Sequence, residues 1–312
     1  MSSSPQRILL TGANGTIGRS WLEAIGQHAP GISTRAVVRS SGAAAQIEAL
    51  GKAAAPEETR IVDYTDPKAI AAAAKGCDAA IHLVGILRET PPSTYADAHE
   101  ATCQALAEGA AKAGLRQIVY PSIFGASPQS SNACLGSKGR AERILLDGPV
   151  AATILRLPMV MERADAATRA LRNQAQSPVL WLPGGGSTLQ QPIDVRDVIS
   201  ALLASVQTSS PQNTVLELGG PEVLSHRELV GRAAKILGGR PRIVGIPLPL
   251  VRAASLVLET LLGNPPITRT VLEVLQHDDC VDNSAAFAAL GIALRDLDTT
   301  LRYCLQEDED AR

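Results

Sequence analysis

Cysteine is scarce in this 312-residue sequence, and the few cysteines form no known ligand pattern. They are odd in number, widely spaced and without a CxxC pair, at Cys77, Cys103, Cys134, Cys280 and Cys304. This spacing argues against a disulfide framework or a zinc site and favours free thiols in a reducing compartment. The histidines lack HxxxH and HExxH spacing, so we expect no metal site. No GxSxG motif is present, which leaves serine hydrolysis without its usual nucleophile.

The sequence also lacks long apolar runs and long runs of one charge. No apolar run has the length of a membrane span, and residues 1–6 have no apolar core of the kind that a signal peptide needs. We therefore expect a cytoplasmic protein that is not transmembrane. The formal net charge is −2, and residues 307–310 form the single block of like charge, which is acidic. This argues against a nucleic-acid partner.

A glycine-rich turn near the start is what the sequence does contain. Residues 7–10 are an apolar run, and Gly12, Gly15 and Gly18 then recur at intervals of three ahead of a helical pattern. This order predicts strand, tight turn and helix, although such a turn can also be no more than a turn. In the functional reading, the first glycine permits the turn, the second admits a pyrophosphate and the third lets the helix lie against the sheet.

The start of that helix would bind an anion through its free N–H groups and its dipole. We therefore expect a nicotinamide dinucleotide at this loop. The expected contacts are Thr11, Gly12, Asn14, Gly15, Thr16, Ile17 and Gly18.

Strand-like and helix-like stretches alternate through the first two thirds of the chain. Six further β-like runs lie at 33–38, 59–62, 79–84, 117–120, 153–157 and 215–218, with alanine-rich or amphipathic stretches between most of them. This alternation predicts an α/β fold with a Rossmann-type doubly wound parallel sheet of about seven strands. Such a fold binds its nucleotide across the carboxyl ends of the strands.

Beyond about residue 157 the alternation weakens, and proline and glycine accumulate. We expect a dinucleotide-binding domain of residues 1–157, to which residues 192–218 return. Residues 158–191 and 219–312 would then form a smaller C-terminal α/β domain for a substrate or partner.

The end of the second strand bears on the choice of cofactor. An NAD site usually carries an acidic residue about 20 residues after the glycine loop. Here no acidic residue stands at positions 24–47, and Arg35, Arg39, Ser40 and Ser41 cluster where the ribose should lie. Guanidinium and hydroxyl groups suit a 2′-phosphate, so NADP(H) is favoured over NAD(H). The alternative is that Arg39 is only a solvated arginine at a strand end.

Two later strand ends supply further candidate contacts. Asp63 closes the third strand, where it could accept a hydrogen bond from the adenine amino group or simply begin a turn. Val84 and Gly85 follow the fourth strand, where the glycine would let backbone approach the cofactor. A plain glycine at a strand end is the alternative reading of Gly85.

Several stretches together resemble one known group of proteins. They are Thr11-Gly12-x-x-Gly15-x-x-Gly18, residues 81–87, Ser137-Lys138 with Glu142, residues 155–158, and residues 183–186 leading to 191–198. They resemble the extended and atypical short-chain dehydrogenase/reductase superfamily, in particular the branch of the nucleotide-binding accessory subunit of respiratory complex I. The resemblance covers nearly the whole chain.

The resemblance implies roles for three residues. Lys138 would bind the nicotinamide ribose, Pro158 would flank the nicotinamide, and Ser122 would lie near the nicotinamide and the substrate. Each has a structural alternative: a solvated helix residue for Lys138, a strand-end cap for Ser122 and the end of a strand for Pro158.

The sequence departs from the active members of this superfamily at one position. Active members carry a tyrosine one helical turn before the lysine, and here that position is Cys134. Tyr95 and Tyr120 lack the helical spacing to Lys138. We therefore expect an NADP(H)-binding protein with weak or no turnover.

Two alternatives remain open. One is an active NAD(P)H-dependent oxidoreductase acting on a carbonyl or quinone-like substrate, with Cys134, Ser122 or a water molecule moving the proton. The other is a nucleotide-sugar epimerase or dehydratase, which normally needs the tyrosine as well.

A strongly apolar helical stretch covers residues 247–262, with Arg252, Ser255 and Glu259 on one face. Such a helix most often belongs to a core. The alternative is that it lines a lipophilic pocket or meets a protein partner or a membrane surface.

Overall fold

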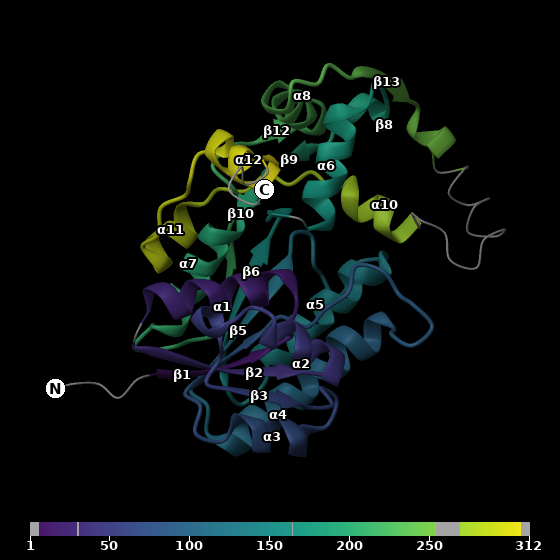
Figure 1. Cartoon of the computed structure of the whole chain (residues 1–312). Coiled ribbons are helices and arrows are strands. Elements are labelled where there is room, and N and C mark those ends of the chain that lie inside the picture. Colours follow the sequence, from purple (N-terminus) through teal and green to yellow (C-terminus); the bar gives the residue numbers. More distant parts are fainter. Residues whose placement is uncertain (1–5, 30, 164, 252, 254–268, 307–312) are drawn as a thin grey trace. The chain divides into compact units, whose positions relative to one another are not determined.

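The computed structural model describes residues 6–29, 31–163, 165–251, 253 and 269–306 (Figure 1). The chain divides into two compact units, each formed by separate segments. The first unit takes Met1–Arg156, Ile199–Leu216 and Ala288–Ile292, and the second takes Leu157–Val198, Glu217–Phe287 and Ala293–Arg312. Most of the helix expected over residues 247–262 lies outside the described residues, including its three polar positions.

A seven-stranded sheet forms the centre of the first unit. Its strands are β1 (Gln6–Thr11), β2 (Ile32–Val38), β3 (Glu58–Ile61), β4 (Ala79–His82), β5 (Gln117–Ile123), β6 (Ala151–Leu157) and β11 (Thr214–Glu217). Their order is β11-β6-β5-β4-β1-β2-β3. The pairs β1–β2, β1–β4, β2–β3 and β4–β5 are parallel. Reversal of the strand order at β1 is the arrangement of a dinucleotide-binding sheet, and it confirms the predicted Rossmann-type fold.

Helices cover both faces of this sheet. They are α1 (Thr16–His28), α2 (Ser41–Glu48), α3 (Pro67–Ala74), α4 (Thr102–Ala113), α5 (Ala133–Leu146) and α7 (Val195–Val206), with a 3₁₀ turn η1 (Lys52–Ala54) and a π-helix η2 (Ala96–Ala101). Ile70 of α3, Leu106 of α4 and Leu145 of α5 join one buried cluster with Ile118 and Ile154 of the sheet. In Figure 1, α1 lies on the opposite side of the sheet from α3 and α4.

Local signals set where these helices begin. Asp66 accepts a hydrogen bond from the Lys68 amide at 2.8 Å, and Pro67 occupies the first turn of α3. Asn132 caps α5 by accepting from the amides of Cys134 and Leu135 at 3.0 and 3.1 Å. Capping side chains of this kind satisfy amides that the helix itself leaves without a partner.

The second unit is built from short strands and helices. It contains β7 (Val160–Met161), α6 (Ala166–Gln176), β8 (Val179–Pro183), η3 (Gly184–Gly186), β9 (Leu189–Gln190), β10 (Ile193–Asp194), β12 (Leu224–Ser225), α8 (His226–Leu237), β13 (Arg242–Ile246), α10 (Arg269–Leu275), α11 (Ser284–Leu290) and α12 (Leu297–Leu305). The strands pair as β10–β7, β12–β9 and β13–β8. A separate apolar cluster joins Leu171 of α6, Leu229 of α8 and Leu301 of α12.

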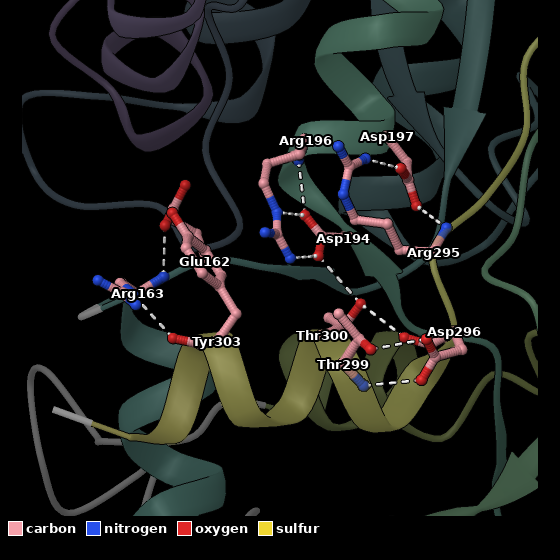
Figure 2. Close-up of polar contacts among 10 residues, drawn as sticks. All are labelled: Glu162, Arg163, Asp194, Arg196, Asp197, Arg295, Asp296, Thr299, Thr300 and Tyr303. Atoms are coloured by element: carbon pink, nitrogen blue, oxygen red, sulfur yellow. Dashed lines mark hydrogen bonds and ion pairs between the residues drawn. The ribbon is translucent and has the colours of Figure 1, made fainter. Parts of the chain in front are cut away.

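A buried carboxylate ties α12 to β10 (Figure 2). The Asp194 side chain is fully buried and accepts from Nε of Arg196 at 2.9 Å and from its Nη2 at 2.5 Å. It also accepts from the Thr300 hydroxyl at 3.0 Å, across 106 residues of sequence. Burial works to raise the pKa of Asp194, but the hydrogen bonds from Arg196 outweigh it and the pKa is lowered.

Further polar contacts hold the same helix (Figure 2). The buried Asp197 carboxylate forms an ion pair with Arg295 and accepts from the Arg295 amide at 2.9 Å. The guanidinium groups of Arg163 and Arg196 lie 4.2 and 3.8 Å from the centre of the Tyr303 ring. The C-terminal helix is therefore held by charges as well as by its apolar face.

Replacing Asp194 with alanine should destabilise the second unit, because Arg196 and Thr300 lose their shared acceptor. We expect a loss of about 3 kcal/mol, the lower end for breaking a buried pair, since Arg196 stays partly exposed. Asp298→Ala, at an exposed carboxylate 3.6 Å from Arg232, is the matched control and should change little. Urea denaturation followed by circular dichroism measures both.

The lowered pKa of Asp194 also fixes the pH dependence. Its contribution is present above the ordinary aspartate pKa near 3.9 and is lost as the pH falls through the lower folded-state value. Equal midpoints for the two variants at neutral pH would contradict the role given to Asp194.

Candidate functional site

Gly12 ends β1 in a position that only glycine fits. Its φ of +72° lies in the left-handed region, and a Cβ there would stand 3.0 Å from the Leu83 carbonyl carbon, just beyond β4. Its amide donates to the Val37 carbonyl of β2 at 3.2 Å. The turn is thus pressed between the ends of two neighbouring strands, as the glycine spacing predicted.

The other two glycines shape the start of α1. Gly15 is the N-cap residue; no side chain caps the helix, and no acidic residue stands in its first turn. The first intrahelical bond runs from the Arg19 amide to the Gly15 carbonyl, so the preceding amides have no earlier turn to bond. A Cβ on Gly18 would stand 2.5 Å from the Ala13 carbonyl oxygen. Gly18 therefore lets α1 pack on the loop backbone, whereas the sequence predicted contact with the sheet.

Two polar side chains of the loop already have partners. The Thr11 hydroxyl is fully buried, 2.7 Å from Nδ1 of His82. Asn14 donates from its amide to Gln46 at 3.1 Å. The hydrogen-bond donors that this loop can offer to a ligand are therefore mainly backbone amides, including those of Thr16 and Ile17.

The residues after β2 differ in what they can offer. Arg39 is exposed and forms no ion pair within the described part of the chain. Ser40 caps α2, accepting from the Ala43 amide at 3.2 Å. Arg35 is buried in mid-strand, where it donates to Glu58 and to the Ala73 carbonyl, each at 2.7 Å. The expectation that Arg35 lies with Arg39 and the two serines is wrong, because the Arg35 side chain is hydrogen-bonded to β3 and α3.

Residues after β3 form a turn beside the glycine loop. The exposed Asp63 accepts from the amide and hydroxyl of Thr65 at 2.9 and 2.8 Å, and these bonds lower the pKa of Asp63. The next residue, Tyr64, accepts from the Gly12 amide at 3.0 Å and donates to the Val37 carbonyl at 2.9 Å. Sequence reasoning missed Tyr64, although an aromatic residue directly after a strand end was a usable signal.

Lys138 lies on α5 over the end of β5. Its ammonium is buried; it donates to the Tyr120 hydroxyl at 2.9 Å and stands 4.5 Å from the centre of that ring. Burial lowers the pKa of Lys138. The structure thus gives Lys138 a tyrosine partner from the sheet, and not from its own helix. Tyr120 is itself fully buried, so its phenol binds the lysine without reaching solvent.

Two neutral histidines complete this buried polar group. His82 lies between the hydroxyls of Thr11 and Thr102, at 2.7 and 3.2 Å, and burial lowers its pKa to about 3. Nε2 of His99 lies 3.0 Å from the Ile86 amide nitrogen, and burial lowers the pKa of His99 to about 3 as well. His99 sits in the π-helix η2, a geometry that often marks functional sites.

The segment after β4 runs past this group. A Cβ on Gly85 would stand 3.1 Å from the Lys138 ammonium and 3.5 Å from Nε2 of His99, so glycine keeps the backbone close to both. The Val84 side chain packs on the apolar core, and the Val84 backbone lies beside the glycine loop.

Cys134 precedes Lys138 by one turn of α5. Its thiol is buried 3.9 Å from the Ile86 carbonyl and contacts the Tyr95 side chain. The Tyr95 hydroxyl donates to the Leu87 carbonyl at 2.8 Å. Burial raises the pKa of the Cys134 thiol and raises that of Tyr95 to about 12. Both groups are therefore protonated at neutral pH.

The last two predicted residues lie at strand ends. Ser122 belongs to β5, two residues after Tyr120, so strand alternation puts both on the α5 face. The Ser122 hydroxyl is buried without a hydrogen-bond partner among the described residues. Pro158 directly follows β6 and belongs to the second unit.

The described residues show neither a metal-ligand cluster nor a helix suited to span a membrane. No group of three or more histidine, cysteine, aspartate or glutamate side chains is placed to hold a metal ion. None of the described helices combines the length and the apolar character required to cross a bilayer.

Comparisons with known proteins agree with this geometry. A protein-family model described as NAD(P)H-binding matches residues 12–205. The chain is 28% identical over 207 residues to the mitochondrial NADH dehydrogenase [ubiquinone] 1 alpha subcomplex subunit 9 of Arabidopsis thaliana. The matched stretch covers 65% of this chain but only 52% of that protein. It is 27% identical over 290 residues to the ceramide reductase of Caulobacter vibrioides, covering 90% of the chain and 87% of that protein.

Solved structures share the fold. The structure of gox2253 matches with a TM-score of 0.75 at 21% identity, covering 96% of this chain and 97% of that one. A UDP-glucose-4-epimerase from Stenotrophomonas maltophila, with bound NAD and formylated UDP-arabinopyranose, matches with a TM-score of 0.74 at 18% identity and the same coverage. These structures show the fold alone, whereas the family model and the complex I subunit confirm the resemblance inferred from the sequence.

Removing the Tyr120 hydroxyl should weaken the first unit, because the buried Lys138 ammonium loses its acceptor at 2.9 Å and keeps the more distant Pro121 carbonyl at 3.4 Å. We expect Tyr120→Phe to lower the free energy of unfolding by about 1.5–3 kcal/mol, the range for a hydrogen bond to a charged group. Tyr303→Phe is the matched control, since the described contacts of Tyr303 use its ring and backbone. Urea denaturation tests the pair, and a cost no larger than that of the control would refute the role of Tyr120.

Proposed function

This chain belongs to the NAD(P)H-binding family, and on that premise we propose an NADP(H)-binding protein of the atypical short-chain dehydrogenase/reductase type with weak or no turnover. The observation that carries the proposal is the pair on α5. Lys138 is present and held by Tyr120, whereas the position one turn earlier carries a buried cysteine. Binding would therefore survive while proton transfer is impaired.

The glycine loop fits the pyrophosphate of a dinucleotide. The uncapped start of α1 offers amides and a positive dipole end to an anion. A Cβ on Gly15 would come within 4 Å only of the Gly12 carbonyl oxygen among non-neighbouring atoms, at 3.2 Å. We assign the pyrophosphate to these amides, with Val84 and Gly85 beside it.

NADP(H) is the proposed form of the cofactor. Support comes from Arg39, an exposed guanidinium without an ion pair in the described chain, next to the hydroxyl of Ser40. Asp63 accepts hydrogen bonds from Thr65 within its own turn, which favours a role in the turn over a contact with the adenine amino group. Lys138 would hold the nicotinamide ribose, and Ser122 and Pro158 would lie near the nicotinamide.

The same residues explain why turnover should be weak. A bound nicotinamide supplies or accepts a hydride, and a reductase must deliver a proton at the same carbonyl. General acid catalysis of this kind typically contributes 10²–10⁴-fold. None of the three nearby acids is well suited to this task. The Cys134 thiol is buried with a raised pKa, and the Tyr95 phenol donates to the Leu87 carbonyl. Tyr120 is fully buried and bonded to Lys138.

An active carbonyl reductase is the second candidate. It is favoured by the match to ceramide reductase over 90% of this chain. In that case the buried Ser122 hydroxyl, which has no partner among the described residues, or the Tyr95 phenol would be the proton donor. A quinone-like substrate fits the same chemistry. The epimerase or dehydratase reading is least favoured, because those structural neighbours are below 25% identical and share only the fold.

We also propose a division of labour within the chain. Residues 1–157 and 192–218 would bind the nucleotide, and residues 158–191 and 219–312 would bind a substrate or partner. A cytoplasmic location remains part of the proposal.

Arg39→Ala should separate the two cofactors. Loss of a charge-assisted contact to a 2′-phosphate costs about 1.5–3 kcal/mol, or roughly 10- to 150-fold in affinity. NADPH binding should weaken by that factor, whereas NADH binding should hardly change. Arg143→Ala, at an exposed arginine of α5, is the control. Isothermal titration calorimetry would refute the assignment if the unmodified protein bound NADH more tightly than NADPH.

Cys134 variants should separate binding from catalysis. The unmodified protein and Cys134→Ala should bind NADPH equally and reduce quinones or aldehydes negligibly. Cys134→Tyr needs the space beside the thiol that Tyr95 now takes, so the double variant Cys134→Tyr/Tyr95→Ala should gain turnover, up to about 10²–10⁴-fold. Tyr95→Ala alone is the control.

The decisive readout is NADPH oxidation followed by absorbance. An ordinary enzymatic rate in the unmodified protein, lost in Cys134→Ala, would make the thiol a working acid and end the binding-protein proposal.

A further inference from the structure

The ribbon formed by β8 and β13 in the second unit has one apolar face turned to solvent. Leu182 is buried and Leu180 packs on the unit's apolar cluster, so alternation turns Val179 and Trp181 outward. These two side chains are 43% and 60% exposed. Tryptophan is enriched at interfaces, and contiguous exposed apolar patches mark interaction surfaces.

The partner strand extends the same face. The strands are parallel, with Arg242 opposite Val179, Val244 opposite Trp181 and Ile246 opposite Pro183. Residues directly opposite each other in a sheet share a face. We call the set Val179, Trp181, Arg242, Val244 and Ile246 the outer ribbon face; Val244 and Ile246 are half-buried and the other three are exposed.

Along the two strands and the stretches of sequence that flank them, charge has one sign. No aspartate or glutamate occurs at positions 166–193, which contain β8, or at positions 229–258, which contain β13. Arg240 and Arg242 are exposed at the start of β13 and form no ion pair with a described residue. The outer ribbon face thus combines aliphatic side chains and a tryptophan with guanidinium groups and no carboxylate on either strand.

We propose that the outer ribbon face docks on the surface of a bilayer that contains anionic phospholipid. Tryptophan suits the boundary between headgroups and acyl chains, and arginine suits lipid phosphates. Two strands of five residues offer far less than the roughly 20–30 residues a side of a standard protein interface, whereas a bilayer needs no matching shape. The contact is peripheral and independent of the proposed cofactor.

Trp181 reports on this contact without any label. The only other tryptophan, Trp21, is fully buried and donates to the Thr34 hydroxyl at 3.0 Å. The full chain is mixed with vesicles of phosphatidylcholine, with and without phosphatidylglycerol. Vesicles with phosphatidylglycerol should shift the emission to the blue, and brominated acyl chains should quench it. Sedimentation with the vesicles gives the partition coefficient.

Variants separate the apolar and the charged contributions. Each of Arg240→Gln and Arg242→Gln should weaken the partition about fivefold, and Trp181→Ser should weaken it further. Ile61→Ser, at a 57% exposed residue of β3, and Arg143→Gln, at an exposed arginine of α5, are matched controls and should bind as the unmodified chain does.

Three results would each overturn the proposal. One is unchanged emission with every vesicle. Another is protection of Trp181 from acrylamide before vesicles are added, which would mean that another part of the chain covers the face. The third is a dimer in sedimentation velocity that Trp181→Ser dissociates, which would assign the face to a second copy.

Discussion

The passage from β1 into α1 leaves room for backbone only, and the nucleotide-binding edge depends on it. A Cβ on Gly12 would stand 3.0 Å from the Leu83 carbonyl carbon, and the Gly12 amide donates to Val37 and Tyr64. At the other end of the turn, Gly18 presses on the Ala13 backbone. These contacts bring the ends of β1, β2 and β4 together with the open start of α1. A side chain at either glycine would separate them.

The buried ammonium of Lys138 is the second constraint. A buried cation normally requires a carboxylate, but the nearby Glu142 is paired with Arg156 at 2.7 Å. Lys138 relies instead on the Tyr120 hydroxyl and ring, among two histidines that burial keeps neutral. The group is held by these contacts, and burial raises the pKa values of the Tyr95, Tyr120 and Cys134 side chains beside it. It suits positioning of a cofactor better than fast proton transfer.

The sequence predicted the features that depend on local order. The glycine spacing and the alternation of strand and helix were enough for the fold and for the turn at Gly12, and the family resemblance singled out Cys134 one helical turn before Lys138. Long-range contacts were missed, because Tyr120 reaches Lys138 from the sheet and Tyr64 reaches Gly12 from the turn after β3. Arg35 was misplaced because spacing gives a position along the strand but not the direction of a side chain. The bond from Thr300 to Asp194 had no local signal at all.

We propose that this chain holds NADP(H) as a bound cofactor. Mass spectrometry of the nucleotide released from the purified, denatured protein tests it most directly, because it requires no assumption about substrate. We predict NADP⁺ or NADPH in the released fraction. Recovery of NAD⁺, NADH or a nucleotide sugar in its place would contradict it.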